Sequence, residues 1–127
     1  MLILQYYTYN IVKLDITLEE ITGINQALGG TVVSTASIEF ALEAGQGKSI
    51  YHRIALLWRA ILLDQPFSGR NKRTAFNATT LILKRNGVRV GVGEKERLVE
   101  AILKVSKKSE SSLRRIERRI RYAIERN

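Results

Sequence analysis

The sequence predicts a mainly α-helical fold, a compact bundle with a short N-terminal β arm, and three observations favour this class. Apolar residues recur every three or four positions over much of the chain, which is the helical period. The chain contains one proline and few aromatic residues, as expected for helices joined by short connections. Its 127 residues, of which 45% are hydrophobic, suffice to bury one core. We therefore expect residues 1–127 to form a single domain.

The first third of the chain is expected to form a strand followed by two helices. Residues 2–14 mix Leu, Ile, Tyr, Thr and Val, which is typical of a strand or hairpin arm that covers the core or pairs with another subunit. Thr17 and Glu20 have the spacing of a capping box. The helix that they begin should run to about Leu28, where two glycines follow, and a short helix is expected at residues 37–44.

Residues 50–64 predict the central helix of the bundle, because apolar side chains occupy nearly all of its faces. The following Pro66 disfavours helical geometry at the residue before it, so this helix should end at about position 64. A second long helix is expected at residues 71–86. Asn71 is its candidate N-cap, and Gly87 is the candidate residue just beyond its C-terminus.

The last third of the chain predicts a short strand and two amphipathic helices. Residues 88–92, "VRVGV", alternate as a strand does. The apolar residues of the two helices recur with helical spacing: Leu98, Ala101, Ile102 and Val105 in one, and Leu113, Ile116, Ile120 and Ala123 in the other.

The composition excludes several kinds of site. The chain has no cysteine and a single histidine, His52, which excludes disulfides, thiolate nucleophiles and multi-histidine metal centres. We expect His52 to be a surface or capping residue, because it lies at the start of the central helix, far from the loop that follows that helix. No apolar run approaches the length of a membrane span, and we expect a cytosolic protein without a membrane partner.

The positive charge is concentrated in the last third of the chain. Residues 1–83 carry seven Lys/Arg and six Asp/Glu, whereas residues 84–127 carry fourteen and six. A net charge of +8 in one segment favours an acidic partner such as nucleic acid, an acidic protein or a phosphorylated ligand. The final helix contributes six arginines, which either contact phosphates or form a solvated face: Arg114, Arg115, Arg118, Arg119, Arg121 and Arg126.

The strongest candidate for a site is the segment "QPFSGRNKRTAF" at residues 65–76. It joins the two long helices and places Lys72 and Arg73 in the first turn of the second. Free N–H groups and the positive end of the helix dipole make such a terminus an anion site. Basic side chains are unfavourable there, so a bound anion would relieve a local conflict. Phe67 is expected to anchor the loop by burying its ring.

This segment resembles the signature of the Fic/Doc family, specifically its Doc (death-on-curing) branch, which reads His-Pro-Phe-x-Asp/Glu-Gly-Asn-Lys-Arg-Thr. The resemblance extends to "TLEEI", "IEFAL" and "LILKRNG" and covers about 110 residues. It implies a Fic/Doc-like helical bundle. In that family, members transfer AMP, or a phosphoryl group in the Doc branch, from a nucleoside triphosphate to a protein hydroxyl. Doc proteins act as toxins against translation, and a small antitoxin neutralises them.

Carried over to this chain, the resemblance assigns Asn71, Lys72 and Arg73 to the nucleotide phosphates and Phe67 to anchoring the loop. Three positions depart from the signature. Gln65 replaces the histidine that serves as general base, and a carboxamide accepts no proton at physiological pH. Gly69 replaces the acidic Mg²⁺ ligand, and Arg70 replaces the glycine, adding positive charge where the metal would lie. Asp64 is an alternative base, although it should point in a different direction from Gln65.

These substitutions indicate a Doc-like protein of a toxin–antitoxin module with a degenerate active site. It would keep a phosphate or nucleotide site, with ATP as the candidate ligand and Mg²⁺ doubtful, and would have weak or no transferase activity. Its partner would be a small antitoxin-like protein or a translation-factor target. Two alternatives stay open: a divergent nucleotidyl- or phosphotransferase that uses Arg70 in place of Mg²⁺, and a nucleic-acid-binding protein that uses the basic C-terminal third. The oligomeric state also stays open, including a dimer.

Overall fold

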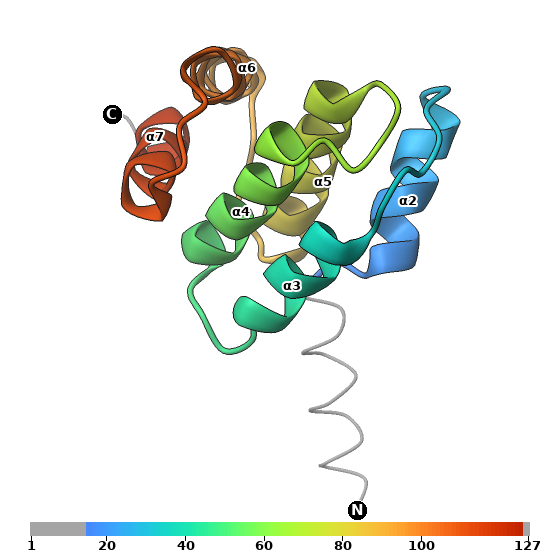
Figure 1. Ribbon diagram of the computed structural model, residues 1–127. Coiled ribbons are helices and arrows are strands. Elements are labelled where there is room, and N and C mark those ends of the chain that lie inside the picture. Colours follow the sequence, from blue (N-terminus) through green and yellow to red (C-terminus); the bar gives the residue numbers. More distant parts are fainter. Residues whose placement is uncertain (1–14, 126–127) are drawn as a thin grey trace, which may run out of the picture.

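The computed structural model describes residues 15–125, and the predicted β arm at residues 2–14 lies outside them. The fold is mainly α-helical, as predicted (Figure 1). Its elements are α2 (Leu18–Ala27), α3 (Ala36–Ala44), α4 (Ile50–Trp58), the π-helical segment η1 (Arg59–Leu63), α5 (Asn71–Arg85), α6 (Val92–Lys108) and α7 (Leu113–Glu125).

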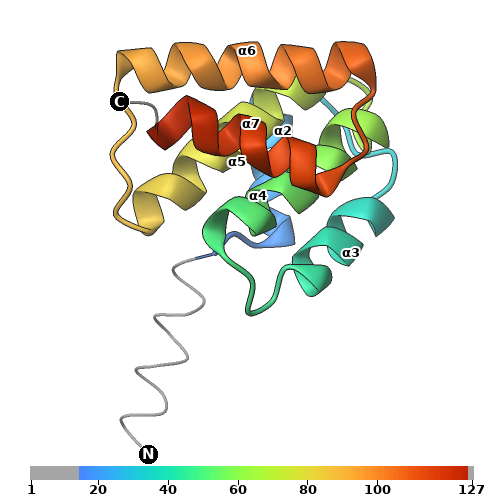
Figure 2. The ribbon, with the colours of Figure 1, turned by 90° about the vertical axis from the view of Figure 1, so that its left-hand side faces the viewer.

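The predicted central helix is the centre of the bundle. It consists of α4 and η1, which together contact α3, α5, α6 and α7 (Figure 1). Ile54, Trp58 and Ile61 are fully buried along it. The indole Nε1–H of Trp58 donates a hydrogen bond to Thr79 Oγ1 of α5 at 2.7 Å, so the largest core side chain has its polar atom satisfied. Figure 2 shows α7 running back beneath α6 on one side of this core.

The predicted helix ends agree with the structure at several points. Thr17 Oγ1 accepts a hydrogen bond from the Glu20 N–H at 3.1 Å, and Glu20 Oε1 accepts one from the Thr17 N–H at 3.0 Å. This is the expected capping box. Gly87 follows α5 with a φ of 73°, a conformation that glycine adopts without steric cost.

The central helix differs from the prediction in its last turn, where residues 59–63 adopt π-helical geometry. A π segment accommodates an additional residue and turns the following side chains. Ala60, Ile61 and Leu62 are all buried. Apolar side chains occupy nearly all faces of the helix predicted at residues 50–64. The spacing of its apolar residues therefore did not reveal where the α-helical period changes to the π-helical one.

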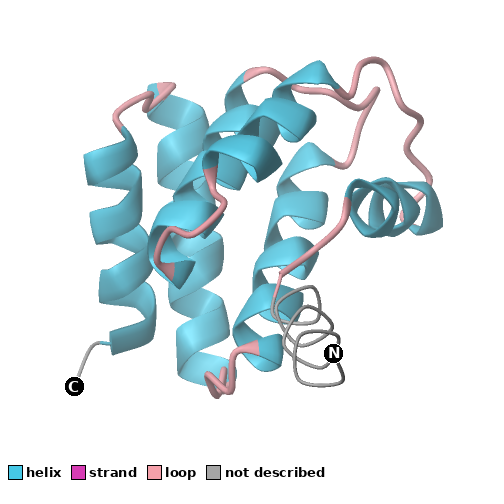
Figure 3. Cartoon of the chain, turned by 90° about the horizontal axis from the view of Figure 1, so that it is seen from below, coloured by secondary structure: helices cyan, strands magenta, loops and turns pink. Residues whose placement is uncertain are grey.

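The strand predicted at residues 88–92 is wrong. Residues 88–91 form a connection without regular structure, and α6 already begins at Val92. Val88 and Val90 alternate because they pack against the core as partly buried side chains, not because they belong to a sheet. Figure 3 shows no strand in the described part of the chain, where β pairing is limited to a single antiparallel bridge between Val32 and Phe67.

Candidate functional site

The loop between η1 and α5 is held in shape by two buried residues at its start. Pro66 and Phe67 are buried, with Phe67 only 3% exposed, so the ring anchors the loop as predicted. Gln65 and Arg70 flank the loop with φ values of 48° and 63°. Residues other than glycine rarely adopt this left-handed conformation, and it occurs preferentially at functional sites whose surroundings impose it.

The connection between α2 and α3 pairs with this loop. The Ser68 N–H donates to the Thr31 carbonyl at 2.9 Å, and the Val33 N–H donates to the Pro66 carbonyl at 2.8 Å. The hydroxyl oxygens of Thr31 and Ser68 lie 2.7 Å apart. These contacts, together with the Val32–Phe67 bridge, fix the loop against a segment more than thirty residues earlier in the chain.

Asn25 of α2 holds the loop through side-chain hydrogen bonds. This residue was not among those selected from the sequence. This fully buried side chain donates from Nδ2 to the Gly69 carbonyl at 2.9 Å and to Thr74 Oγ1 at 3.1 Å. Thr74 in turn donates to the Arg70 carbonyl at 2.7 Å. The sequence did contain a sign of this role. Asn25 follows the buried Ile21 by one helical turn, so a polar amide lies on the apolar face of α2, where it needs hydrogen-bond partners.

Asn71 is not the N-cap of α5, contrary to the prediction. Arg70 occupies that position in its left-handed conformation and provides no side-chain cap, while Asn71 is the first helical residue. The Asn71 amide instead turns back to the loop, where Nδ2 donates to the Phe67 carbonyl at 3.0 Å and Oδ1 accepts from the Phe67 N–H at 3.3 Å. Asn71 therefore stabilises the loop, and the first N–H groups of α5 are not capped by the side chain before them.

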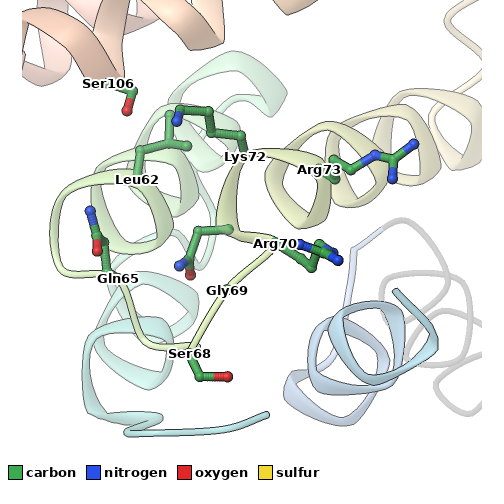
Figure 4. A pocket seen from close by; sticks show the side chains of 9 residues that line it. Leu62, Gln65, Ser68, Gly69, Arg70, Lys72, Arg73 and Ser106 are labelled. Carbon is green, nitrogen blue, oxygen red and sulfur yellow. The ribbon is translucent and has the colours of Figure 1, made fainter. Parts of the chain in front are cut away.

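The loop and the start of α5 form a cleft of about 340 Å³. Its lining contains most of the residues that sequence analysis selected, and α6 adds Ser106: Leu62, Gln65, Ser68, Gly69, Arg70, Asn71, Lys72, Arg73 and Ser106 (Figure 4). None of these lining residues carries a carboxylate or an imidazole. Phe67 lies in the core behind the loop and is absent from the lining.

The three cations of the cleft point in different directions. Lys72 extends toward Ser106 and Leu62, whereas Arg70 and Arg73 point away from Gln65 (Figure 4). Arg70 Nε donates to the carbonyl of Leu28, beyond the end of α2, at 3.2 Å. None of the three forms an ion pair with a carboxylate among residues 15–125. The cleft is therefore positively charged and not neutralised by the described part of the protein.

The two other candidate bases lie elsewhere. Asp64 lines a separate hollow with Phe40 of α3 and Arg59 of η1 and is not part of the lining of the cleft at Gln65. His52 lies in the first turn of α4, where its Nδ1 is 3.3 Å from Glu117 Oε2 of α7. This histidine joins two helices at the end of α4 opposite the loop. Within the described residues, no group of three His, Asp or Glu side chains is placed to hold a metal ion.

Among the described residues, two arginines of α7 form ion pairs within the protein. Arg121 lies 3.2 Å from Glu117 and 3.6 Å from Glu125, and its guanidinium lies 4.5 Å from the centre of the Tyr51 ring. Arg115 lies 3.8 Å from Glu110. Arg114 and Arg118 are exposed, whereas Arg126 lies outside the described residues. Some arginines of α7 therefore form contacts within the protein, whereas others are exposed to solvent.

No helix of the described residues is long and apolar enough to cross a membrane. Comparisons of the chain with protein-family models, curated proteins and solved structures found no match.

Proposed function

We propose that this protein is a Doc-like member of a toxin–antitoxin module that binds the phosphates of a nucleotide in the cleft at residues 65–73 and has little or no transferase activity. The observation that carries the proposal is a cleft with three cations and no carboxylate, built around a helix N-terminus without a side-chain cap. Phosphate oxygens can accept hydrogen bonds from both the N–H groups and the cations.

Lys72 is the main candidate for contact with the phosphates, because it extends across the cleft toward Ser106 (Figure 4). Arg73 provides a second exposed cation on the same helical turn. Ser68 and Ser106 provide hydroxyls at the rim, and Gln65 provides a neutral amide. Asn71 acts through the loop, since its amide is bonded to the backbone of Phe67.

The lining explains why little transfer is expected. Phosphoryl and nucleotidyl transfer to a hydroxyl depend on a base that accepts its proton and on charge neutralisation of the phosphates, usually by Mg²⁺. The cleft contains neither an imidazole nor a carboxylate, so its residues fit phosphate oxygens but not Mg²⁺. The absence of a base alone reduces rates by about 10²–10⁴-fold. In this proposal the protein acts by binding, and its partner is a small antitoxin-like protein or a translation-factor target.

Calorimetric titration with ATP, with and without Mg²⁺, tests the proposal. We expect ATP to bind in both conditions, and Lys72→Ala and Arg73→Ala each to weaken binding by about tenfold or more, because each removes a charge-assisted contact. Arg114→Ala is the matched control, since it removes an exposed arginine of α7 that does not line the cleft.

Two results would contradict the proposal in different ways. Undetectable ATP binding to the wild type, or equal losses in Arg114→Ala and Arg73→Ala, would refute the nucleotide site. Transfer of label from ATP to a protein hydroxyl by the wild type would instead refute the loss of activity and support the divergent transferase.

A further inference from the structure

A second basic surface lies between α6 and α7, apart from the cleft at residues 65–73. The two helices, which lie side by side in Figure 2, enclose a groove of about 240 Å³. Four cations line it, accompanied by a single carboxylate and one aromatic ring: Arg97, Lys104, Arg118, Arg119, Glu100 and Tyr122.

The cations of this groove are only partly satisfied within the protein. Arg97 is fixed, because its Nε donates to the Ala123 carbonyl at 2.9 Å. The Nε–H of Arg119 is buried and has no acceptor among the described residues, which is a costly state for a charged donor. Lys104 and Arg118 are exposed and form no ion pair with any described residue. A carboxylate entering the groove would meet the exposed cations of Lys104 and Arg118.

The groove also has an apolar component, which distinguishes it from a purely electrostatic surface. Most of the surface that lines it is apolar. Tyr122 of α7 is 60% exposed and lines the groove together with Ala101 of α6. An exposed aromatic ring in a largely apolar lining, beside unneutralised cations, favours a ligand that offers both apolar groups and carboxylates.

We propose that the α6–α7 groove binds an acidic amphipathic helix of another protein. The groove between two helices accepts a third helix, with apolar side chains at every third or fourth position placed between them. Carboxylates beside those positions would pair with Lys104, Arg118 and Arg119. Duplex nucleic acid fits less well, because phosphates gain nothing from an apolar lining. A second copy of this chain fits less well too, because each copy carries a net charge of +9 and repels the other.

Fluorescence anisotropy tests this proposal with a synthetic, labelled peptide of about four helical turns that carries leucines on one face and glutamates beside them. The control peptide has the same composition in scrambled order. We expect the amphipathic peptide to bind and the scrambled peptide to bind at least about tenfold more weakly. Arg118→Glu should weaken binding about tenfold or more, and Tyr122→Ser should weaken it as well.

The control variant for Arg118→Glu is Lys48→Glu, which reverses an exposed charge in the α3–α4 connection and should leave binding unchanged. Circular dichroism establishes that each variant is folded. Lack of binding of the amphipathic peptide would overturn the proposal, and so would equal binding of the scrambled peptide or no effect of Arg118→Glu. Tighter binding of duplex or single-stranded DNA, with displacement of the peptide, would overturn it in favour of a nucleic-acid surface. These outcomes are independent of ATP binding at residues 65–73.

Discussion

At the scale of single residues, Arg70 is one of three non-glycine residues with a left-handed backbone among residues 15–125, with a φ of 63°. The Fic/Doc signature has glycine here, and glycine adopts this conformation without the clash that a Cβ creates. We expect Arg70→Gly to be more stable than Arg70→Ala by about 1 kcal/mol, because both variants lose the bond to the Leu28 carbonyl and only glycine relieves the strain. Urea unfolding of the two variants measures this difference. Equal stabilities would mean that the left-handed backbone costs nothing here.

At the scale of the elements, one buried polar contact joins α4 to α5. Thr79 Oγ1 accepts from Trp58 Nε1 at 2.7 Å and donates to the Ala75 carbonyl, also at 2.7 Å. Thr79→Val keeps the shape but leaves the indole N–H unsatisfied, so we expect a loss of about 1–3 kcal/mol. Thr80→Val is the control, because the partly buried Thr80 hydroxyl only bonds the Asn77 carbonyl of its own helix. Denaturant unfolding followed by Trp58 fluorescence measures the stability of both variants. Equal losses of stability in Thr79→Val and Thr80→Val would contradict the prediction.

At the scale of the whole molecule, the ion pair between Glu20 and Arg85 links α2 to the end of α5 across 65 positions of sequence. The hydrogen bonds from Arg85 hold the pKa of Glu20 down, from 4.5 to about 2, against the opposing effect of burial. On acidification, Glu20 of the unfolded chain is protonated near pH 4.5, whereas Glu20 of the folded chain is protonated only near pH 2. The contribution of the Glu20–Arg85 pair to stability is therefore complete above pH 4.5 and is lost as the pH falls from 4.5 to about 2.

We therefore expect the free energy of unfolding to fall between about pH 4.5 and pH 2. Over the same range, neutralisation of the carboxylates leaves the 21 Lys and Arg residues to repel one another. Glu20→Gln should be less stable than the wild type at neutral pH and should lose less stability on acidification. Urea titrations at several pH values measure both curves. Parallel curves for the two proteins would show that the Glu20–Arg85 pair does not contribute to acid sensitivity.

The sequence alone determined the order of the helices and several of their ends, where the signal was local, although the N-cap of α5 is Arg70 and not the predicted Asn71. The capping box of Thr17 and Glu20, the glycine beyond α5 and the apolar central helix depend on side chains a few positions apart, and the structure agrees with each. The sequence also located the connection between the central helix and α5, because Pro66 disfavours helical geometry at the residue before it.

Tertiary structure decided the features that depend on distant neighbours. Asn25 reaches Gly69 across 44 positions of sequence, and Ser106 joins the cleft only because α6 packs against η1 and α5. Residues 88–91 have the alternation of a strand but no partner strand, and the π segment 59–63 lies in a region whose uniform apolarity conceals its period. Periodicity reports which face of an element is buried, whereas the identity of the group that meets that face depends on how the whole chain packs.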